Sequence, residues 1–167
     1  TRCNRWSRGL GDVYKRQARG NVQGLEADLR WYASDAVELY ASLGLMSSEL
    51  GESGRDLAHA PRYSISAGAV YRSASGFFAR LDATARDEYF FDVTHDEKSQ
   101  AYELVNARVG FEGENWRIEL WARNLFDEQY AVRGFYFGNE PPDFPPALYT
   151  RAGDPRHVGL TLERRFH

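Results

Sequence analysis

The sequence is short of cysteine and methionine, and it has no long apolar run. Of its 167 residues, one is Cys and one is Met. The single cysteine, Cys3, cannot form a disulfide within the chain, which excludes a disulfide framework, and no Cys/His cluster indicates a zinc site. No stretch approaches the roughly 18 consecutive apolar residues that a membrane-spanning helix needs. The sequence therefore predicts no transmembrane helix.

The chain also lacks the surplus of positive charge that is typical of nucleic-acid-binding proteins. It has 21 Lys and Arg against 24 Asp and Glu, for a net charge of −3, so we expect no nucleic-acid partner. Aromatic residues are plentiful, with 10 Phe, 10 Tyr and 4 Trp, and this content argues against disorder. The mean hydropathy of −0.59 resembles that of a soluble protein, but the order of the residues favours another interpretation.

The first 17 residues differ in charge from the rest of the chain. Asp12 is their one acidic residue, and their basic residues are Arg2, Arg5, Arg8, Lys15 and Arg16. They contain neither the apolar core nor the cleavage site of a secretory signal. The run Ser7–Gln17 resembles translated adapter sequence found at the ends of metagenomic gene fragments. We interpret residues 1–17 as a non-native tail and residues 18–167 as the folded segment; a basic arm that binds an acidic partner is the alternative.

From Val22 onward, apolar and polar residues alternate with a period of two, which predicts β-strands rather than helices. Between the apolar positions, nearly every segment carries full charges of both signs. Each strand is expected to be about 9 to 11 residues long, which matches a tilted crossing of a bilayer. The apolar positions of the seven strands run over Leu25–Trp31, Val37–Leu45, Tyr63–Tyr71, Phe77–Ala85, Val105–Phe111, Trp116–Ala122 and Val158–Leu162.

The connections between these segments alternate between short and long. In an antiparallel up-and-down sheet, strict alternation places every short turn at one end and every long loop at the other. Outer-membrane barrels show this asymmetry, with short periplasmic turns and long extracellular loops. The tight polar turns lie at residues 33–36, 73–76 and 112–115, and the long connections lie at residues 47–61, 87–100 and 125–154.

The direction in which the apolar face points decides between a membrane barrel and a soluble fold. A soluble β-sandwich or a lipocalin-like ligand-binding module would turn this face inward, and both remain alternatives. The charged opposite face favours a wide, wet lumen. Aromatic residues at strand ends beside the short turns favour a membrane girdle, because amphipathic rings settle at headgroup depth. The expected girdle residues are Trp31, Tyr71, Phe77, Phe111, Trp116 and Phe166.

Seven strands are fewer than the eight with which bacterial barrels begin. We therefore expect an all-β fold, an antiparallel up-and-down transmembrane β-barrel that is partial here. The chain would supply about seven strands at the carboxyl-terminal end of a larger barrel. Its first strand, Val22–Tyr32, would then leave a bare edge for the missing neighbour.

Several segments resemble TonB-dependent outer-membrane receptors. Trp116–Tyr130, which contains Asn-Leu-Phe-Asp, resembles the penultimate strand of these receptors and the segment that follows it. Gly153–Phe166 resembles their closing strand. Other barrel strands of the family are similar to Gly24–Trp31, Leu39–Leu45 and Ala60–Tyr63. The order and spacing of these segments together identify the chain as the carboxyl-terminal part of such a barrel.

The resemblance implies a 22-stranded barrel around an amino-terminal plug, in the outer membrane of a Gram-negative bacterium. It implies uptake of a scarce nutrient, by default a ferric siderophore, with energy from the inner-membrane TonB complex. It implies neither enzyme activity nor a cofactor. In this family the plug and the TonB box precede the barrel, so we expect the plug, the remaining strands, the TonB complex, the lipid bilayer and a small-molecule ligand as partners. Another kind of outer-membrane β-barrel protein is the remaining alternative.

Receptors of this family usually end on an aromatic residue that the barrel-assembly machinery reads. Phe166 is the candidate for this signal, although His167 follows it. The resemblance therefore gives Phe166 two expected roles, one in the girdle and one in assembly.

The longest connection, residues 125–154, carries the candidate ligand site. It is rich in aromatic residues and in proline, and it holds two arginines. Aromatic faces and guanidinium groups suit an anionic, conjugated metal chelate. The alternative is a loop that packs on itself. The candidate binding residues are Arg133, Phe135, Tyr136, Phe137, Tyr149 and Arg151.

Other polar groups carry weaker signals. Asp92, His95, Asp96 and Glu97 could suggest a metal, but their spacing fits no known ligand pattern, so we expect a solvated acidic loop and no metal site. No nucleophile elbow or glycine-rich phosphate loop is present, so we predict no catalytic residue. Charge pairing across the lumen face is expected for Arg117, Glu119, Arg123, Glu163 and Arg165.

Overall fold

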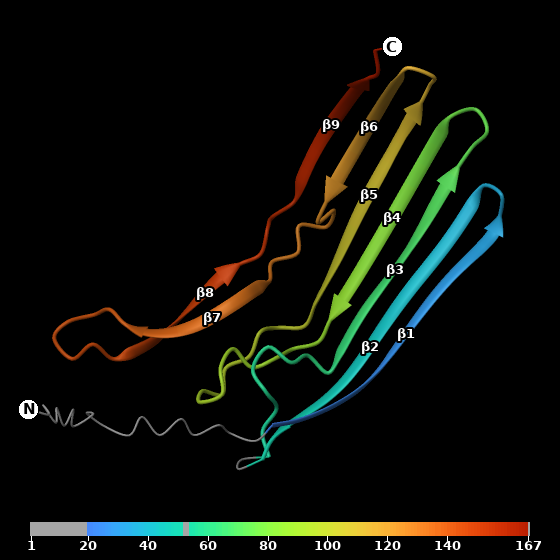
Figure 1. Cartoon of the computed structure of the whole chain (residues 1–167). Coiled ribbons are helices and arrows are strands. Elements are labelled where there is room, and N and C mark those ends of the chain that lie inside the picture. The colour runs from blue at the N-terminus through green and yellow to red at the C-terminus, as the bar shows by residue number, and fades with distance from the viewer. Residues whose placement is uncertain (1–19, 52–53, 167) are drawn as a thin grey trace, which may run out of the picture.

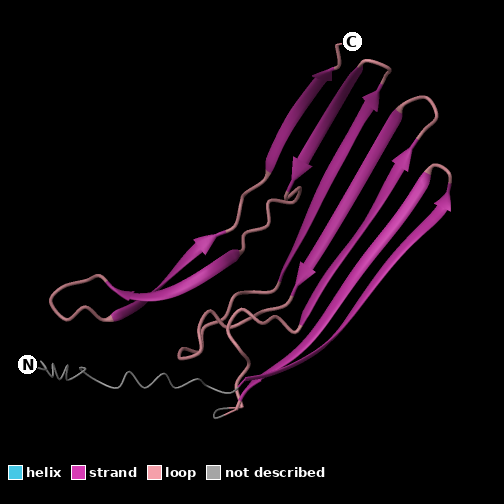
Figure 2. Cartoon of the chain, viewed as in Figure 1, coloured by secondary structure: helices cyan, strands magenta, loops and turns pink. Residues whose placement is uncertain are grey.

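The computed structural model describes residues 20–51 and 54–166, and all regular structure in this part is β (Figure 2). None of the described residues lie in a helix long and apolar enough to span a membrane. The strands are β1 (Gly20–Ser34), β2 (Val37–Leu50), β3 (Tyr63–Arg72), β4 (Phe77–Arg86), β5 (Tyr102–Glu112), β6 (Trp116–Arg123), β7 (Ala131–Gly138), β8 (Pro146–Ala152) and β9 (His157–Arg164).

Seven of these strands form one antiparallel sheet in the order β1-β2-β3-β4-β5-β6-β9 (Figure 1). The predicted all-β, up-and-down arrangement of seven strands is confirmed. The sheet runs from β1 to β9 without closing on itself, as expected for part of a barrel. β7 and β8 form a separate two-stranded hairpin between β6 and β9, and the sequence pattern did not predict this hairpin.

The register keeps apolar residues opposite apolar residues across the sheet. Leu43 pairs with Ile65, and Phe77 pairs with Phe111. A slip of one residue would turn every apolar side chain to the charged face, so the alternation and the short turns together specify the register. The short turns and the long connections fall at opposite ends of the sheet, as expected.

The first two strands are longer than the alternation predicts. β1 has 15 residues and β2 has 14, and their pairing continues from Gly24 opposite Met46 to Gly20 opposite Leu50. The connection expected to begin at residue 47 therefore begins after residue 50. The ladder needs only backbone N–H and C=O groups, so it continues into a polar segment where the alternation has faded.

The apolar face of the sheet is exposed rather than covered by a second layer. Leu25 is 60% exposed, Leu81 49% and Leu162 71%. Among the described residues, the buried apolar side chains are Val70, Tyr89 and Phe91, and two of these lie in the connection after β4. A soluble sandwich or lipocalin-like fold would bury this face, so the arrangement contradicts both alternatives.

Candidate ligand-binding surface

The three long connections meet at the end of the sheet opposite the short turns (Figure 1). The Arg55 guanidinium lies 2.8 Å from the Asp96 carboxylate and joins the first connection to the second. The Tyr89 hydroxyl donates to the Val132 carbonyl at 3.1 Å and joins the second to the third. We call residues 54–61, 87–100 and 125–154 the loop cluster.

A small aromatic core holds the loop cluster together. Tyr89 and Phe91 are each 5% exposed, and their rings meet edge to face at 6.1 Å. The Ser99 hydroxyl accepts the Tyr89 N–H at 3.1 Å, and burial raises the pKa of the Tyr89 hydroxyl. Phe91 packs against Gly134 of β7, where any Cβ would overlap its ring. Sequence reasoning missed this core; the signal for it is the aromatic run at residues 89–91.

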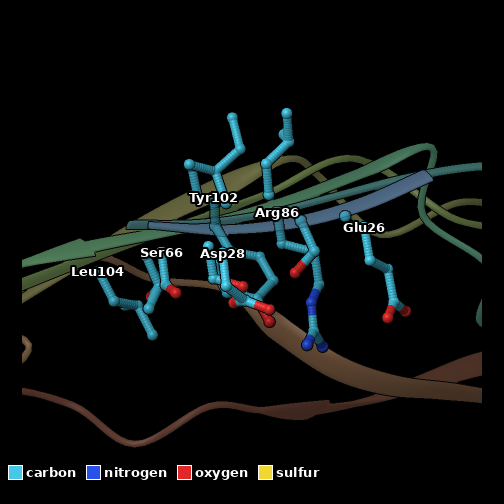
Figure 3. Close-up of a pocket in the computed structure, with 13 residues that line it drawn as sticks. Glu26, Asp28, Ser66, Arg86, Tyr102 and Leu104 are labelled. Carbon is cyan, nitrogen blue, oxygen red and sulfur yellow. The ribbon is translucent and has the colours of Figure 1, made fainter. Parts of the chain in front are cut away.

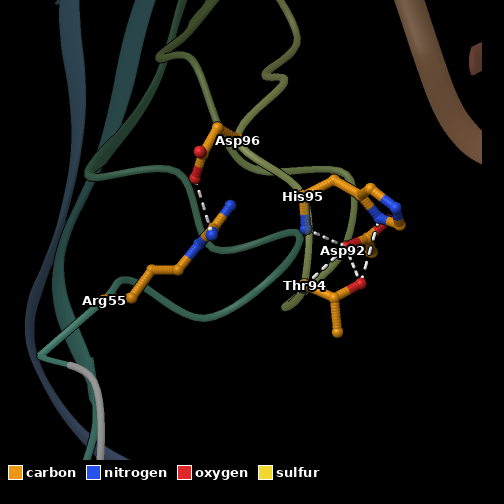
Figure 4. Close-up of polar contacts among 5 residues, drawn as sticks. All are labelled: Arg55, Asp92, Thr94, His95 and Asp96. Carbon is orange, nitrogen blue, oxygen red and sulfur yellow. Dashed lines mark hydrogen bonds and ion pairs between the residues drawn. The ribbon is translucent and has the colours of Figure 1, made fainter.

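Asp92, which follows this core, forms a turn held by hydrogen bonds to Thr94 and His95 (Figure 4). The Asp92 carboxylate accepts the backbone N–H groups of Thr94 and His95 at 2.7 and 2.8 Å. Burial raises the pKa of Asp92, but the backbone and side-chain hydrogen bonds from Thr94 and His95 together outweigh it and hold this pKa below its usual range. In the described part of the chain, no group of three or more His, Cys, Asp or Glu side chains is arranged to hold a metal ion.

The alternation of side chains along the β7–β8 hairpin divides the predicted ligand residues between its two faces. Arg133 pairs with Arg151, Phe135 with Tyr149, and Phe137 with Ala147. Because alternate residues of a strand share a face, the structure brings five of the six predicted residues together. We call this side the outer face of the hairpin; its predicted residues are Arg133, Phe135, Phe137, Tyr149 and Arg151.

Tyr136 lies on the opposite, inner face of the hairpin. Its ring stacks on His95 of the second connection, with the centroids 3.5 Å apart and the planes 12° from parallel. Burial and the nearby Glu97 carboxylate raise the pKa of the Tyr136 hydroxyl to about 12. The structure thus separates Tyr136 from the other five predicted residues and places it in the contact between two connections.

The charged face of the sheet forms a continuous polar wall. Glu119 is 7% exposed and lies 2.6 Å from Arg117 on its own strand and 3.7 Å from Arg108 on β5. Arg123 instead places its guanidinium 5.4 Å from the Trp121 ring centre. The expected charge pairing therefore includes Glu119, whereas the described contacts of Arg123 place it over an aromatic ring.

A groove of about 530 Å³ lies along this wall. Glu26, Asp28 and Arg86 extend to the same side of the sheet there (Figure 3). Ser66 and Leu104 also line it. The groove is lined by charged and hydroxyl groups together with apolar side chains and has no arrangement that resembles a catalytic site.

Three aromatic side chains of the wall lie directly opposite glycines on neighbouring strands. In each pair the ring fills the space that a Cβ at the glycine position would occupy, and an arginine lies over the ring at 4.6 to 5.5 Å from its centre. Aromatic residues opposite glycine stabilise strand pairing in this way. The pairs are Tyr40 with Gly68, Phe78 with Gly110, and Trp121 with Gly159.

A family model described as "TonB dependent receptor-like, beta-barrel" matches residues 3–125, which is most of the chain. The chain belongs to this family.

Solved structures of TonB-dependent receptors have a similar fold. The ferric yersiniabactin uptake receptor FyuA from Yersinia pestis has a TM-score of 0.77 at 19% identity, covering 89% of this chain and 24% of that one. The siderophore receptor PiuA from Acinetobacter baumannii has a TM-score of 0.70 at 17% identity, covering 86% of this chain and 21% of that one. The copper transporter OprC has a TM-score of 0.66 at 16% identity, covering 88% of this chain and 24% of that one. The chain thus spans about a quarter of the length of these proteins, whose names describe receptors and transporters rather than enzymes.

The family model covers the beginning of the chain but not its last strands. The matched range begins at residue 3 and so includes most of the basic segment that we interpret as non-native. That segment lies outside the described residues, and its origin stays a prediction. The match ends at residue 125, before β7, whereas the likeness to FyuA covers 89% of the chain.

The predicted girdle residues of this receptor barrel lie together at the short-turn end. Tyr71 and Phe77 flank the β3–β4 turn with ring centres 6.2 Å apart, and Phe111 stacks on Trp116 across the β5–β6 turn at 5.4 Å. Phe166 is 82% exposed, just beyond the end of β9. Trp31, which is 58% exposed, precedes the β1–β2 turn. Their membrane role stays a proposal.

Proposed function

We propose that this segment forms part of the barrel wall of an outer-membrane receptor that takes up a metal chelate by TonB-dependent transport, with a ferric siderophore as the cargo. The observation that carries the proposal is the family's sheet with its apolar face exposed, its opposite face charged, and its long connections gathered at one end. Such a sheet suits a bilayer on one side and a water-filled lumen on the other.

The orientation of the segment follows from its two ends. Long loops of outer-membrane barrels are extracellular and short turns are periplasmic, so the loop cluster would face the outside of a Gram-negative cell. The aromatic residues at the short-turn end would then form the periplasmic girdle, and Phe166 would be the assembly signal. Both roles depend on the receptor being inserted in the outer membrane.

The cargo is supported by the similar structures and by the loop cluster. FyuA and PiuA are named as receptors of siderophores, and the loop cluster combines exposed aromatic rings with guanidinium groups. Likeness to the copper transporter OprC makes copper uptake the second candidate. The transport step would require the plug and the TonB complex as partners, together with the remaining strands of the barrel.

The test is metal uptake by cells that express the intact receptor from its own gene. Radioactive iron is supplied as three ferric complexes, with 2,3-dihydroxybenzoate, with citrate or with acetohydroxamate, and copper is supplied in parallel. We expect saturable iron uptake that disappears when the TonB gene is deleted. If copper alone were taken up, copper would be the cargo instead of a ferric siderophore. If neither metal showed TonB-dependent uptake, the proposal would be overturned.

A further inference from the structure

The outer face of the β7–β8 hairpin places two positive charges directly opposite each other. Arg133 and Arg151 are a cross-strand pair, and both are exposed. Like charges in such positions destabilise a strand pair. No carboxylate among the described residues forms an ion pair with either guanidinium, whereas Arg80 and Arg117 of the wall each have a carboxylate within 2.7 Å. The pair therefore concentrates positive charge at one point of the hairpin, which favours an anionic ligand.

Exposed aromatic rings continue from this arginine pair along the same face. Phe135 stacks on Tyr149 across the strands, with centroids 5.9 Å apart and planes 24° from parallel. Phe135 is 49% exposed and Phe137 58% exposed. In the same loop cluster the rings of Tyr89 and Phe91 are buried, so the chain can bury aromatic residues here and leaves these on the surface. A flat aromatic ligand could cover them and exclude water.

The inner face of the hairpin fixes the position of the outer face. Gly134 lets the Phe91 ring pack directly on the β7 backbone, and Tyr136 stacks on His95. The Tyr89 hydroxyl also bonds to the Val132 carbonyl. These contacts hold the hairpin against the second connection, so ligand binding would require little ordering of the outer face.

We propose that Arg133 and Arg151 form a clamp for an anionic metal chelate whose flat aromatic groups pack on Phe135, Phe137 and Tyr149. The inference rests on the proposed function and adds the chemical class of the ligand. Guanidinium forks bind carboxylate and catecholate oxygens in a bidentate manner. The anion relieves the repulsion between the arginines, and the rings select an aromatic chelate over an aliphatic one of similar charge. Tyr136 takes no part in ligand contact.

The test is binding of the same three ferric complexes to the purified intact receptor, measured by calorimetry. The 2,3-dihydroxybenzoate complex is anionic and aromatic, the citrate complex anionic and aliphatic, and the acetohydroxamate complex neutral and aliphatic. We expect affinities to fall in that order. Replacing both arginines (Arg133→Gln with Arg151→Gln) should weaken binding of the dihydroxybenzoate complex by about ten-fold or more. Phe135→Leu should weaken this complex and leave the citrate complex unchanged.

The matched control is Arg156→Gln, which removes an exposed positive charge just before β9 and outside the hairpin. Its affinities should equal those of the unaltered receptor. The double arginine variant should also slow hydrogen exchange in β7 and β8, because the repulsion is gone, so binding and hairpin stability should change in opposite directions. If this variant does not fold, the double Arg→Lys variant replaces it and should weaken binding by about three-fold, because the charge stays but the bidentate fork is lost.

Equal affinity for the three complexes, or arginine variants that bind as the unaltered receptor does, would overturn the clamp. TonB-dependent iron uptake that persisted in such an outcome would leave the proposed function intact. Conversely, tight binding of the aromatic complex without TonB-dependent uptake would support the clamp as a binding site and overturn the transport function.

Discussion

The seven-stranded sheet, which we call the strand wall, and the loop cluster differ in which side chains they bury. On the wall, Leu162 is 71% exposed and Leu160 is 60% exposed, while the charged Glu119 is buried. In the loop cluster, Tyr89 and Phe91 are buried, and Arg133 and Arg151 are exposed. The loop cluster follows the rule of water-soluble proteins, whereas the wall reverses it.

The difference shows that the two regions are built for different solvents. Removing an apolar side chain from water lowers the free energy. The strand wall has no protein interior in which its apolar side chains could be buried. In the proposed outer-membrane orientation its apolar residues face lipid, whose tails are as apolar as leucine. The loop cluster extends beyond the lipid in the proposed orientation, so it must bury its own core.

The largest expected effect comes from removing a ring of the loop core. Phe91→Ala should lower the free energy of local opening in the loop cluster by about 3 to 5 kcal/mol. Hydrogen exchange at the Tyr89 and Ser99 amides in the intact receptor measures this loss. Leu160→Ala is the control on the exposed apolar face of the sheet, where in the proposed orientation lipid can fill the space, and it should have a much smaller effect. Equal losses at both sites would mean that the two regions bury apolar groups alike.

A charge on the apolar face should have the next largest effect. Leu81→Arg, in the middle of β4, should destabilise the receptor in lipid vesicles by about 2 to 4 kcal/mol, as measured by denaturant unfolding. Thr84→Arg places the same group on the charged face of the same strand, and we expect little change. If Leu81→Arg left the unfolding free energy unchanged, this surface would not face lipid.

A glycine of the wall provides a smaller effect. A Cβ at Gly159 would overlap the Trp121 ring, which Thr161 holds through a 3.1 Å hydrogen bond from the indole. Gly159→Ala should therefore cost about 1 to 3 kcal/mol of unfolding free energy. At Gly44, on the same face, the nearest atom to a Cβ is the Ser64 carbonyl oxygen at 3.8 Å, so Gly44→Ala should be neutral or slightly stabilising. Equal results at the two glycines would show that the ring contact has no role.

The smallest effect is the response of the loop cluster to acid. The pKa of Asp92 lies below its ordinary value in the folded protein. Its stabilising contribution is therefore complete above the unfolded pKa, about 3.9, and is lost as the pH falls through the folded pKa. We expect hydrogen exchange around residues 92–95, corrected for its intrinsic pH dependence, to accelerate below about pH 4. Asp92→Asn should remove this acceleration.

The fold was predictable because its strands obey a simple rule. Alternation from Leu25 to Leu162 predicts all seven strands of the sheet, and a one-residue slip in their pairing would invert a face. The hairpin was not predicted because Phe135, Tyr136 and Phe137 are three consecutive aromatic residues, which hide the period of two. Six prolines in the chain, five of them between residues 141 and 155, also favour a loop interpretation.

The candidate site was predicted in composition but not in geometry. Arg133 and Arg151 are 18 positions apart, and only the pairing of β7 with β8 places them opposite each other. The same pairing moves Tyr136 to the inner face, which the residue types alone do not reveal. The loop core at Tyr89 and Phe91 depends on contacts with β7, far along the chain, and so has no local pattern beyond its aromatic content.

The paired glycines and rings of the wall change what a solute in the lumen would meet. A hydropathy scale counts Tyr40, Phe78 and Trp121 as bulky apolar groups that project from a strand. Each ring instead lies in the recess above its glycine and has a guanidinium over it. Arg80 and Arg117, two of the three arginines, are themselves paired with carboxylates, so this face presents ion pairs rather than bare rings where its largest side chains lie.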